Sequence, residues 1–265
     1  MGVNTEITKY GVAVIESIPV GQLHTGDMLY NNTLVPQCNA DPTLFCDLYK
    51  VNTVEEFEQA IRTIISKHQE NEMLALHIET HGCEDGLGLV SGELLPWKHF
   101  LDLCRELNNE LSGLLVVTTA LCCSLSMIAA IDPSQRAPFL AVVITRGIVK
   151  AGEVMRGYEE YFKIYRKVLD IGAAKDALRQ EVNSGTVESS PFEMITAAWL
   201  FDEITDIDRD TDAFKHIVND WYCIRKSTDQ TYTRERIEME IRTIFKDLAE
   251  NKRDYYLYKD LYKKR

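Results

Sequence analysis

The sequence lacks the features that define several classes of protein. No run reaches the roughly 18 apolar residues that a membrane-spanning helix needs. The N-terminus has no basic stretch followed by an apolar one, so we expect no signal peptide. Positive charge is scarce, because 29 Lys and Arg face 41 Asp and Glu and the net charge is −12. Nucleic acids bind clustered Lys and Arg, so neither a nucleic acid nor a membrane is an expected partner.

The seven cysteines do not follow a metal-binding or disulfide pattern. Their number is odd, and no C-x-x-C pair occurs. Zinc sites and disulfide frameworks need such spacings, so we predict no metal site and no structural disulfide. Because no export signal precedes them, we expect the thiols to be reduced, as they are in the cytoplasm.

Apolar runs alternate with helical patterns through the first part of the chain. Strands are predicted at residues 11–16, 44–51, 73–79, 114–120 and 139–145, and helices at 53–66, 97–107, 125–131, 152–169 and 172–181. Thr53 and Glu56 form a capping box, and residues 87–95 predict a hairpin that turns at Ser91-Gly92. This order predicts an α/β fold with a mostly parallel sheet and helices on both faces.

The last part of the chain has a different pattern. After Pro191 it is helical only, and the Asp-rich stretch 202–212 is the predicted linker. We therefore expect one domain over residues 1–204 and a helical extension over 205–265. The extension would pack on the domain or serve as an interaction arm for a regulatory protein. Its Tyr-rich stretch at 255–258 is more typical of a docking helix than of a nucleic-acid platform.

Two of the predicted strands end in residues that can carry thiol chemistry. The 73–79 strand leads to His81, and the 114–120 strand leads to Cys122. Ligands bind at the carboxyl ends of strands in an open α/β sheet, so these residues would meet if the strands were neighbours. A nearby imidazole can take the thiol proton and later protonate the leaving amine. His81 and Cys122 are therefore the candidate catalytic residues, whereas His77, inside its strand, is expected to be a satisfied core residue.

Acyl transfer also needs amide donors for the oxyanion of the tetrahedral intermediate. Gly82 has no side chain and lets the backbone approach a substrate closely, so its amide is one candidate donor. The amide of Cys122 is the other. A helix that begins just after Cys122 would add its dipole to the stabilisation of the thiolate.

On these residues the sequence resembles the caspase-like cysteine peptidases, which include caspases, metacaspases, separase and CHAT-type domains. The resemblance rests on the apolar strand ending in His81-Gly82 and the apolar strand ending in Cys122. Positions 81 and 122 are 41 residues apart, and caspases place their His about 50 residues before the Cys. The strand at 139–145 and the long helix after it, closing in AAKDALRQE at 173–181, look most like a CHAT-type domain. The resemblance covers roughly residues 11–182 and implies a caspase-like three-layer sandwich, to which the C-terminal helices are added.

The chain departs from the caspase pattern around the nucleophile. The caspase stretch Gln-Ala-Cys-Arg-Gly is Ala-Leu-Cys-Cys-Ser here, at residues 120–124, so Ser124 stands where caspases have glycine. The double cysteine leaves Cys123 as the alternative nucleophile. Cys122 is favoured because it follows the apolar strand at the distance that the family pattern has, and Cys123 would then face the core.

Three charged residues lie close to these strand ends and are candidates for substrate binding. Glu84 and Asp85 could orient His81, bind a basic P1 side chain (P1 precedes the cleaved bond) or remain solvated carboxylates in a turn. Arg146, at the end of the 139–145 strand, could bind an acidic P1 side chain or a substrate carbonyl, or be a surface arginine.

The resemblance implies a cysteine endopeptidase that cleaves a protein or peptide substrate and needs no cofactor. It also allows a role in a microbial stress or defence system, with a toxin-like or pore-forming protein as the partner. A catalytically inactive module that uses the caspase-like sheet for assembly stays open as the alternative. A flavodoxin-like nucleotide binder ranks last, because no Gly-rich phosphate loop follows the first strand.

Overall fold

The chain forms two compact units. The computed structural model describes residues 7, 9–68, 72–146, 148–168, 170–183, 191–206, 212–228 and 231–262. The first unit comprises Met1–Ile131 and Ala137–Thr196, and the second comprises Asp132–Arg136 and Ala197–Arg265. The predicted boundary at residue 204 falls inside helix α7 (Ala197–Thr205), which packs with α9 (Arg234–Asn251) in the second unit.

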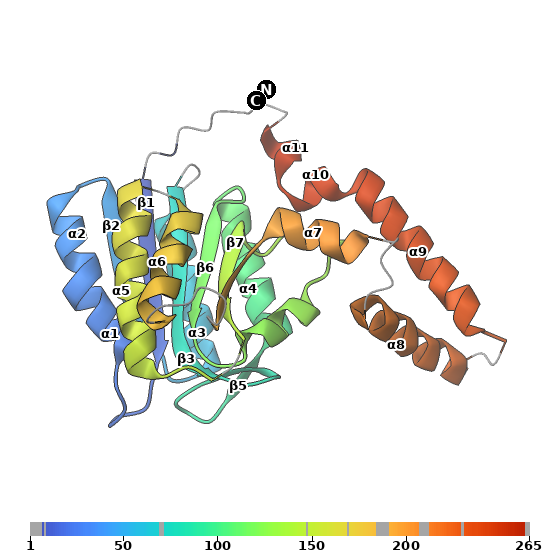
Figure 1. Ribbon diagram of the computed structural model, residues 1–265, viewed down its shortest axis with the longest axis horizontal. Coiled ribbons are helices and arrows are strands. Elements are labelled where there is room, and N and C mark those ends of the chain that lie inside the picture. Colours follow the sequence, from blue (N-terminus) through green and yellow to red (C-terminus); the bar gives the residue numbers. More distant parts are fainter. Residues whose placement is uncertain are drawn as a thin grey trace. The chain divides into compact units, whose positions relative to one another are not determined.

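The first unit is built on one mostly parallel sheet. Its strands are β1 (Lys9–Ser17), β2 (Leu44–Lys50), β3 (Glu72–Gly82), β6 (Leu115–Ala120), β7 (Ala141–Thr145) and β8 (Phe192–Thr196). They lie in the order β2-β1-β3-β6-β7-β8 (Figure 1). All neighbouring pairs along this path are parallel except β7 and β8, so the predicted architecture is confirmed.

Strand β8 corrects the expectation that the chain is only helical after Pro191. It pairs antiparallel with β7, with Ile195 opposite Val142. The residues that are buried on β8, Phe192 and Ile195, are three apart, and helix α7 follows the strand at once. The segment therefore lacks the alternation of a half-buried strand, and its pairing with β7 decides its conformation.

The predicted hairpin is confirmed and extends from the end of β3. Strands β4 (Gly86–Gly88) and β5 (Leu94–Pro96) are antiparallel, and β4 pairs with the last two residues of β3. Gly92 in the connecting turn has a φ of +88°, a conformation that favours glycine. The hairpin therefore places the turn at residues 83–85 beside the carboxyl end of β3.

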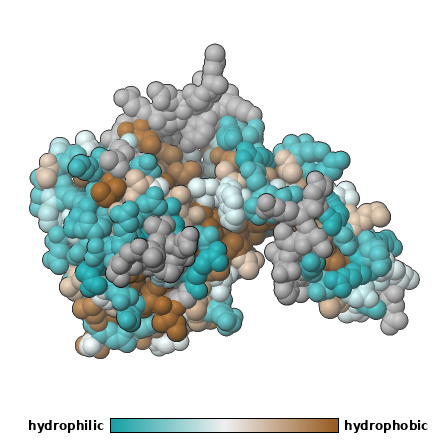
Figure 2. Space-filling view, viewed as in Figure 1, coloured by the Kyte–Doolittle hydropathy of each residue, from teal (hydrophilic) through white to brown (hydrophobic). Residues whose placement is uncertain are grey.

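Helices cover both faces of the sheet, as expected. One face carries α1 (Thr25–Leu29), a π-helix (Tyr30–Leu34), α2 (Val35–Ala40), α5 (Ala151–Val168) and α6 (Ile171–Asn183), and the other carries α3 (Val54–Lys67) and α4 (Trp97–Glu110) (Figure 1). The predicted cap of α3 is present, because the Thr53 side chain accepts a hydrogen bond from the Glu56 amide at 3.1 Å. With the apolar residues turned inward, hydrophilic residues cover much of the visible surface (Figure 2).

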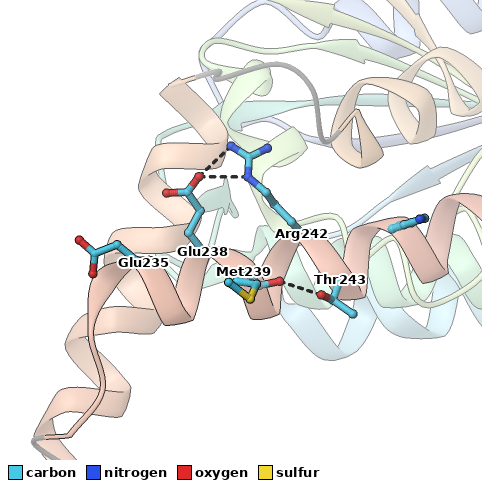
Figure 3. A pocket seen from close by; sticks show the side chains of 6 residues that line it. Glu235, Glu238, Met239, Arg242 and Thr243 are labelled. Carbon is cyan, nitrogen blue, oxygen red and sulfur yellow. Dashed lines mark hydrogen bonds and ion pairs between the residues drawn. The ribbon is translucent and has the colours of Figure 1, made fainter.

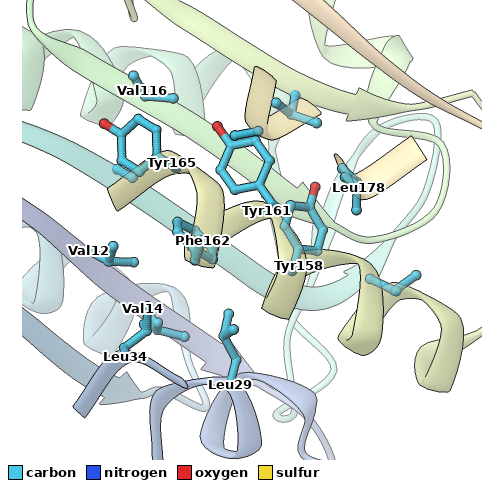
Figure 4. Packing of buried hydrophobic residues seen from close by; sticks show 14 of the residues in the cluster. Val12, Val14, Leu29, Leu34, Val116, Tyr158, Tyr161, Phe162, Tyr165 and Leu178 are labelled. Carbon is cyan, nitrogen blue, oxygen red and sulfur yellow. The ribbon is translucent and has the colours of Figure 1, made fainter. Parts of the chain in front are cut away.

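Aromatic residues of α5 form the centre of the core on the α1 face. Tyr158, Tyr161, Phe162 and Tyr165 are buried and pack with apolar residues of β1, α1 and α6 (Figure 4). The Tyr158 hydroxyl donates to the carbonyl of Thr119 on β6 at 2.9 Å. Helix α5 is thereby held close to the end of β6, directly before the predicted nucleophile.

The second unit is helical. Besides α7 and α9 it contains α8 (Asp212–Thr228), α10 (Arg253–Tyr256) and α11 (Lys259–Tyr262). A small core of Phe214, Val218, Ile237 and Ile241 joins α8 to α9. None of the helices in the described part of the chain has the length and apolar character that crossing a membrane requires.

The Tyr-rich stretch at 255–258 packs inside the second unit. Arg136 donates to both carboxylate oxygens of Asp260, at 2.9 and 2.8 Å, and its guanidinium lies over the rings of Tyr255 and Tyr258. Tyr256 is buried, with its ring 4.8 Å from that of Phe201. These contacts explain why the segment 132–136 belongs to this unit.

Candidate active site

The carboxyl ends of β3 and β6 lie side by side. Their parallel register ends with Glu79 opposite Ala120. His81 follows Glu79 by two residues and lies on the part of β3 that pairs with β4, and Cys122 follows Ala120 by two residues in the turn after β6. A Cβ on Gly82 would lie 2.2 Å from the carbonyl oxygen of Cys122, which shows that the two strand ends are in contact. The structure thus places His81 and Cys122 at adjoining strand ends.

The imidazole of His81 is exposed and is held by a side chain from another loop. Its Nε2 lies 2.9 Å from Oε1 of Gln22. Gln22 lies between β1 and α1. Since the Gln22 oxygen can only accept, the tautomer that makes this bond carries its proton on Nε2 and leaves Nδ1 as the nitrogen that accepts a proton. Sequence reasoning missed Gln22, because nothing local marks it as a partner of His81.

The two adjacent cysteines form the turn after β6. Both thiols are partly exposed, and Cys123 has a φ of 58°. Neither residue is fully buried, so burial does not distinguish Cys122 from Cys123, the one expected to face the core. The buried positions on either side are occupied by Leu121 and Ser124. The helix predicted to follow Cys122 is the 3-10 helix η2 (Ser124–Ala130).

Ser124, where caspases have glycine, anchors this turn to the neighbouring strands. Its side chain is fully buried, and its Oγ accepts from the Thr145 amide at 2.7 Å. The same oxygen lies 2.9 Å from Thr119 Oγ1 and 3.1 Å from Thr145 Oγ1. The Thr145 hydroxyl in turn donates to the carbonyl of Leu121. The serine that stands in place of the caspase glycine thus forms a buried hydrogen-bonded cluster next to the two cysteines.

We expect the Ser124→Ala substitution to lower the free energy of unfolding by about 1–3 kcal/mol, because it leaves the buried Thr145 amide without an acceptor. Ser126→Ala on the same 3-10 helix is the matched control, since Ser126 is only half-buried. Urea denaturation of the two variants measures the difference. Equal stabilities would show that the cluster contributes nothing to holding the turn.

The predicted substrate-binding residues have different surroundings. The side chains of Glu84 and Asp85 are exposed, whereas their carbonyls accept from the indole N–H and the amide of Trp97, at 3.0 and 3.1 Å. Arg146 is also exposed, and its Nε donates to Glu193 on β8 at 2.6 Å. The turn is therefore fixed by its backbone with both carboxylates in solvent, while the positive charge of Arg146 is paired.

A buried polar network beside the site was not recognised from the sequence. Glu16 and Glu79 are opposite each other on β1 and β3, and both are 2% exposed. Glu16 binds Nδ1 of His24 at 2.8 Å, and Glu79 accepts from the Thr25 hydroxyl at 2.6 Å. Carboxylates are seldom buried without partners, and helix α1 supplies partners to both. The network fixes α1, and the loop that carries Gln22, against the sheet.

His77 is a satisfied core residue, as predicted. It is fully buried, its Nδ1 lies 2.8 Å from Thr118 Oγ1, and its Nε2 lies 3.0 Å from Glu79 Oε1. Its ring also packs edge-on against Tyr158. His77 therefore links the carboxylate network to β6 and α5.

The described residues include no group of three or more histidine, cysteine or carboxylate side chains that could hold a metal ion. The second unit has a hollow along α9, where Glu238 accepts from Arg242 at 2.8 Å (Figure 3). Its described lining residues are Glu235, Glu238, Met239, Arg242, Thr243 and Lys246. They all come from one helix, and none is a predicted site residue.

The sheet order, with helices on both faces and a hairpin at the end of β3, defines a caspase-like α/β fold. The chain is similar to the Drosophila initiator caspase Dronc, whose crystal structure it matches with a TM-score of 0.50 over 72% of this chain and 80% of that chain. The sequences are 10% identical over this match, so the likeness concerns the fold. No family model matches the chain, and no curated protein matches it.

Proposed function

We propose that the chain is a cysteine peptidase that hydrolyses peptide bonds of a protein substrate, with Cys122 as nucleophile and His81 as proton carrier. The observation that supports the proposal is the contact between Gly82 and the carbonyl of Cys122, at the adjoining ends of the parallel strands β3 and β6 that lead to His81 and Cys122. A base oriented by a third group is the general arrangement of nucleophilic sites, and Gln22 holds His81 in this way.

The geometry of the hairpin supports the Gly82 amide as an oxyanion donor. The Cys83 amide donates to the carbonyl of Gly86 at 3.0 Å. Hydrogen-bonded and non-hydrogen-bonded pairs alternate along an antiparallel ladder, so the pair that contains Gly82 is non-hydrogen-bonded. Strand β4 lies on the same side of β3 as β1, as shown by the hydrogen bonds from Thr80 Oγ1 to the Gly88 carbonyl and from the Val90 amide to Ser17 Oγ. The Gly82 amide therefore points away from β4, towards the opposite side of β3, where β6 leads to Cys122.

The reaction follows from these positions. Nδ1 of His81 takes the proton of the Cys122 thiol, and the thiolate attacks the carbonyl carbon of the scissile bond. The amides of Gly82 and Cys122 stabilise the oxyanion. Collapse breaks the C–N bond, and His81 protonates the leaving amine. Water then hydrolyses the thioester, which releases the acid and restores the thiol, and no step requires a cofactor.

Substrate contacts and biological setting belong to the same proposal. Glu84 and Asp85 are the candidates for a basic P1 side chain, and Arg146, once released from Glu193, is the candidate for an acidic one. A library of peptides varied at P1 distinguishes them, because preference for Lys or Arg favours the carboxylates and preference for Asp favours Arg146. The proposal also includes kinship with CHAT-type domains and a cytoplasmic location. It further includes a toxin-like or pore-forming partner in a stress or defence system, which the resemblance allows.

Labelling with a peptidyl electrophile tests the proposal. The full chain, kept reduced, is incubated briefly near neutral pH, and adducts are counted by intact-protein mass spectrometry and located by peptide mapping. We expect one adduct at Cys122, because a thiol activated by a base reacts faster than the other cysteines. The adduct should be absent in Cys122→Ala, slower to form in His81→Ala and unchanged in Cys123→Ala.

The other outcomes are equally informative. Loss of the adduct only in Cys123→Ala would keep the mechanism and move the nucleophile by one residue. A folded wild-type chain that forms no adduct at either cysteine would contradict the peptidase. It would favour the alternative, a catalytically inactive caspase-like module whose helical second unit binds a regulatory protein.

A further inference from the structure

A buried arginine at the edge of the sheet has no carboxylate within ion-pair distance among the described residues. Arg166 on α5 is 7% exposed, and its described acceptors are the carbonyls of Leu34 and Phe45 at 3.2 Å, Oε1 of Gln37 at 3.2 Å, and Sγ of Cys38 at 3.0 Å. None of these is a carboxylate, and the Nε of Arg166 is buried with no hydrogen-bond partner in the described structure. A buried cation is costly without a counter-charge.

Among the described acceptors of Arg166, the Cys38 sulfur is the one that can become an anion. The guanidinium faces this sulfur directly, with Nη2 of Arg166 3.0 Å from Sγ of Cys38. The other charged or titratable groups described around this pair are the Tyr30 hydroxyl on the π-helix, Cys46 and Asp47 on β2, Asp41 after α2, and the buried Tyr165 on α5. Asp41 is exposed and is already bonded to the amide and hydroxyl of Thr43.

A second thiol lies against the first. Nη2 of Arg166 donates both to Cys38 on α2 and to the carbonyl of Phe45, the residue before Cys46 on β2. Burial, and then the neighbouring Cys38 thiol, raise the pKa of Cys46 to about 12. Both sulfurs are partly exposed. Cys46 therefore keeps its proton beside a sulfur that faces a cation.

We propose that Cys38 and Cys46 form a redox-active dithiol that a hydroperoxide oxidises to an intramolecular disulfide. The Cys38 thiolate attacks one peroxide oxygen, the O–O bond breaks, and Cys38 becomes a sulfenic acid while the departing oxygen takes a proton. The Cys46 sulfur then displaces the hydroxyl group, which leaves as water with the Cys46 proton. With hydrogen peroxide, two sulfurs are oxidised and the peroxide is reduced to two waters.

The disulfide would join α2 to the edge strand β2 and remove the anion beside Arg166. It uses neither His81 nor Cys122, so this inference is independent of the proposed peptidase activity. The vicinal pair of Cys122 and Cys123 gives no comparable site, because no described cation contacts either thiol.

The experiment treats the reduced full chain with hydrogen peroxide, stops the reaction with catalase and maps the cysteines by peptide mass spectrometry. We expect the loss of two hydrogen atoms and a disulfide between the peptides of Cys38 and Cys46. In Cys46→Ser, Cys38 should instead accumulate as sulfenic acid that dimedone traps. Its trapping should be about tenfold faster than that of the exposed Cys83, which no cation contacts in the described part of the chain.

Arg166→Met tests the role of the cation. Trapping at Cys38 should slow by about tenfold while trapping at Cys83 stays the same. If this variant does not fold, the wild-type and Cys46→Ser results decide alone. Cys38 and Cys46 both remaining free to alkylate after oxidation, or Cys38 reacting no faster than Cys83, would overturn the proposal.

Discussion

The Gly82→Ala substitution is expected to lower the rate of thiol labelling at Cys122 by about 100-fold, because a misplacement of about 1 Å is enough for such a loss. The new Cβ would lie 2.2 Å from the Cys122 carbonyl oxygen and 2.4 Å from Cδ1 of Leu121. One of these atoms belongs to the backbone and cannot move away by a side-chain rotation. The ends of β3 and β6 must therefore separate, and His81 moves away from Cys122.

The same substitution should also destabilise the first unit by about 1–3 kcal/mol, the usual cost of an added group in a packed site. Gly88→Ala is the matched control. Gly88 pairs with His81 across the β3–β4 ladder, but a Cβ there would lie no closer than 3.6 Å to the carbonyl oxygen of His81, an ordinary contact. Labelling kinetics and urea denaturation of both variants provide the comparison. Unchanged labelling in Gly82→Ala would show that the reactivity of Cys122 does not depend on the close contact between the strand ends.

The sequence was sufficient for most of the sheet, because its parallel strands are buried on both faces and separated by helices with clear periodicity. The 3.6-residue pattern and the cap at Thr53 predicted α3 with few errors at its ends. Strand β8 was missed for a physical reason. Its five residues show no alternation, and antiparallel pairing with β7, which involves residues about 50 positions away, makes it a strand.

The candidate site was predicted only in part, because its residues meet across strands. His81 and Cys122 stand at strand ends that a local pattern can identify, and the family resemblance supplied the expectation that these ends are adjacent. Gln22 and Glu16 could not be found in this way. Their partners, His81 and His24, are set by the register of β1 with β3 and by the position of α1, which no local pattern determines.

Replacement of Glu79 by alanine is expected to lower the free energy of unfolding of the first unit by about 3–5 kcal/mol, because two buried polar groups each lose a partner at about 1–3 kcal/mol and the cavity adds to this. Glu79 accepts from Thr25 at 2.6 Å and contacts Nε2 of His77 at 3.0 Å, and all three side chains are buried. Alanine leaves the Thr25 hydroxyl and one nitrogen of His77 without partners and creates a cavity under α1.

Glu79→Gln is the control that keeps the shape. Its amide oxygen can still accept from Thr25, and its NH2 group can donate to Nε2 of the other His77 tautomer, so we expect a loss of only about 1–2 kcal/mol. Urea denaturation followed by the fluorescence of Trp97 reports on the first unit, provided that Trp199 and Trp221 of the second unit are replaced by phenylalanine in every variant. Equal losses in the two variants would mean that the cavity, and not the unpaired polar groups, determines the cost. If the Glu79→Ala chain stays stable but Cys122 is labelled more slowly, the role of the network is instead to position α1 and Gln22 around His81.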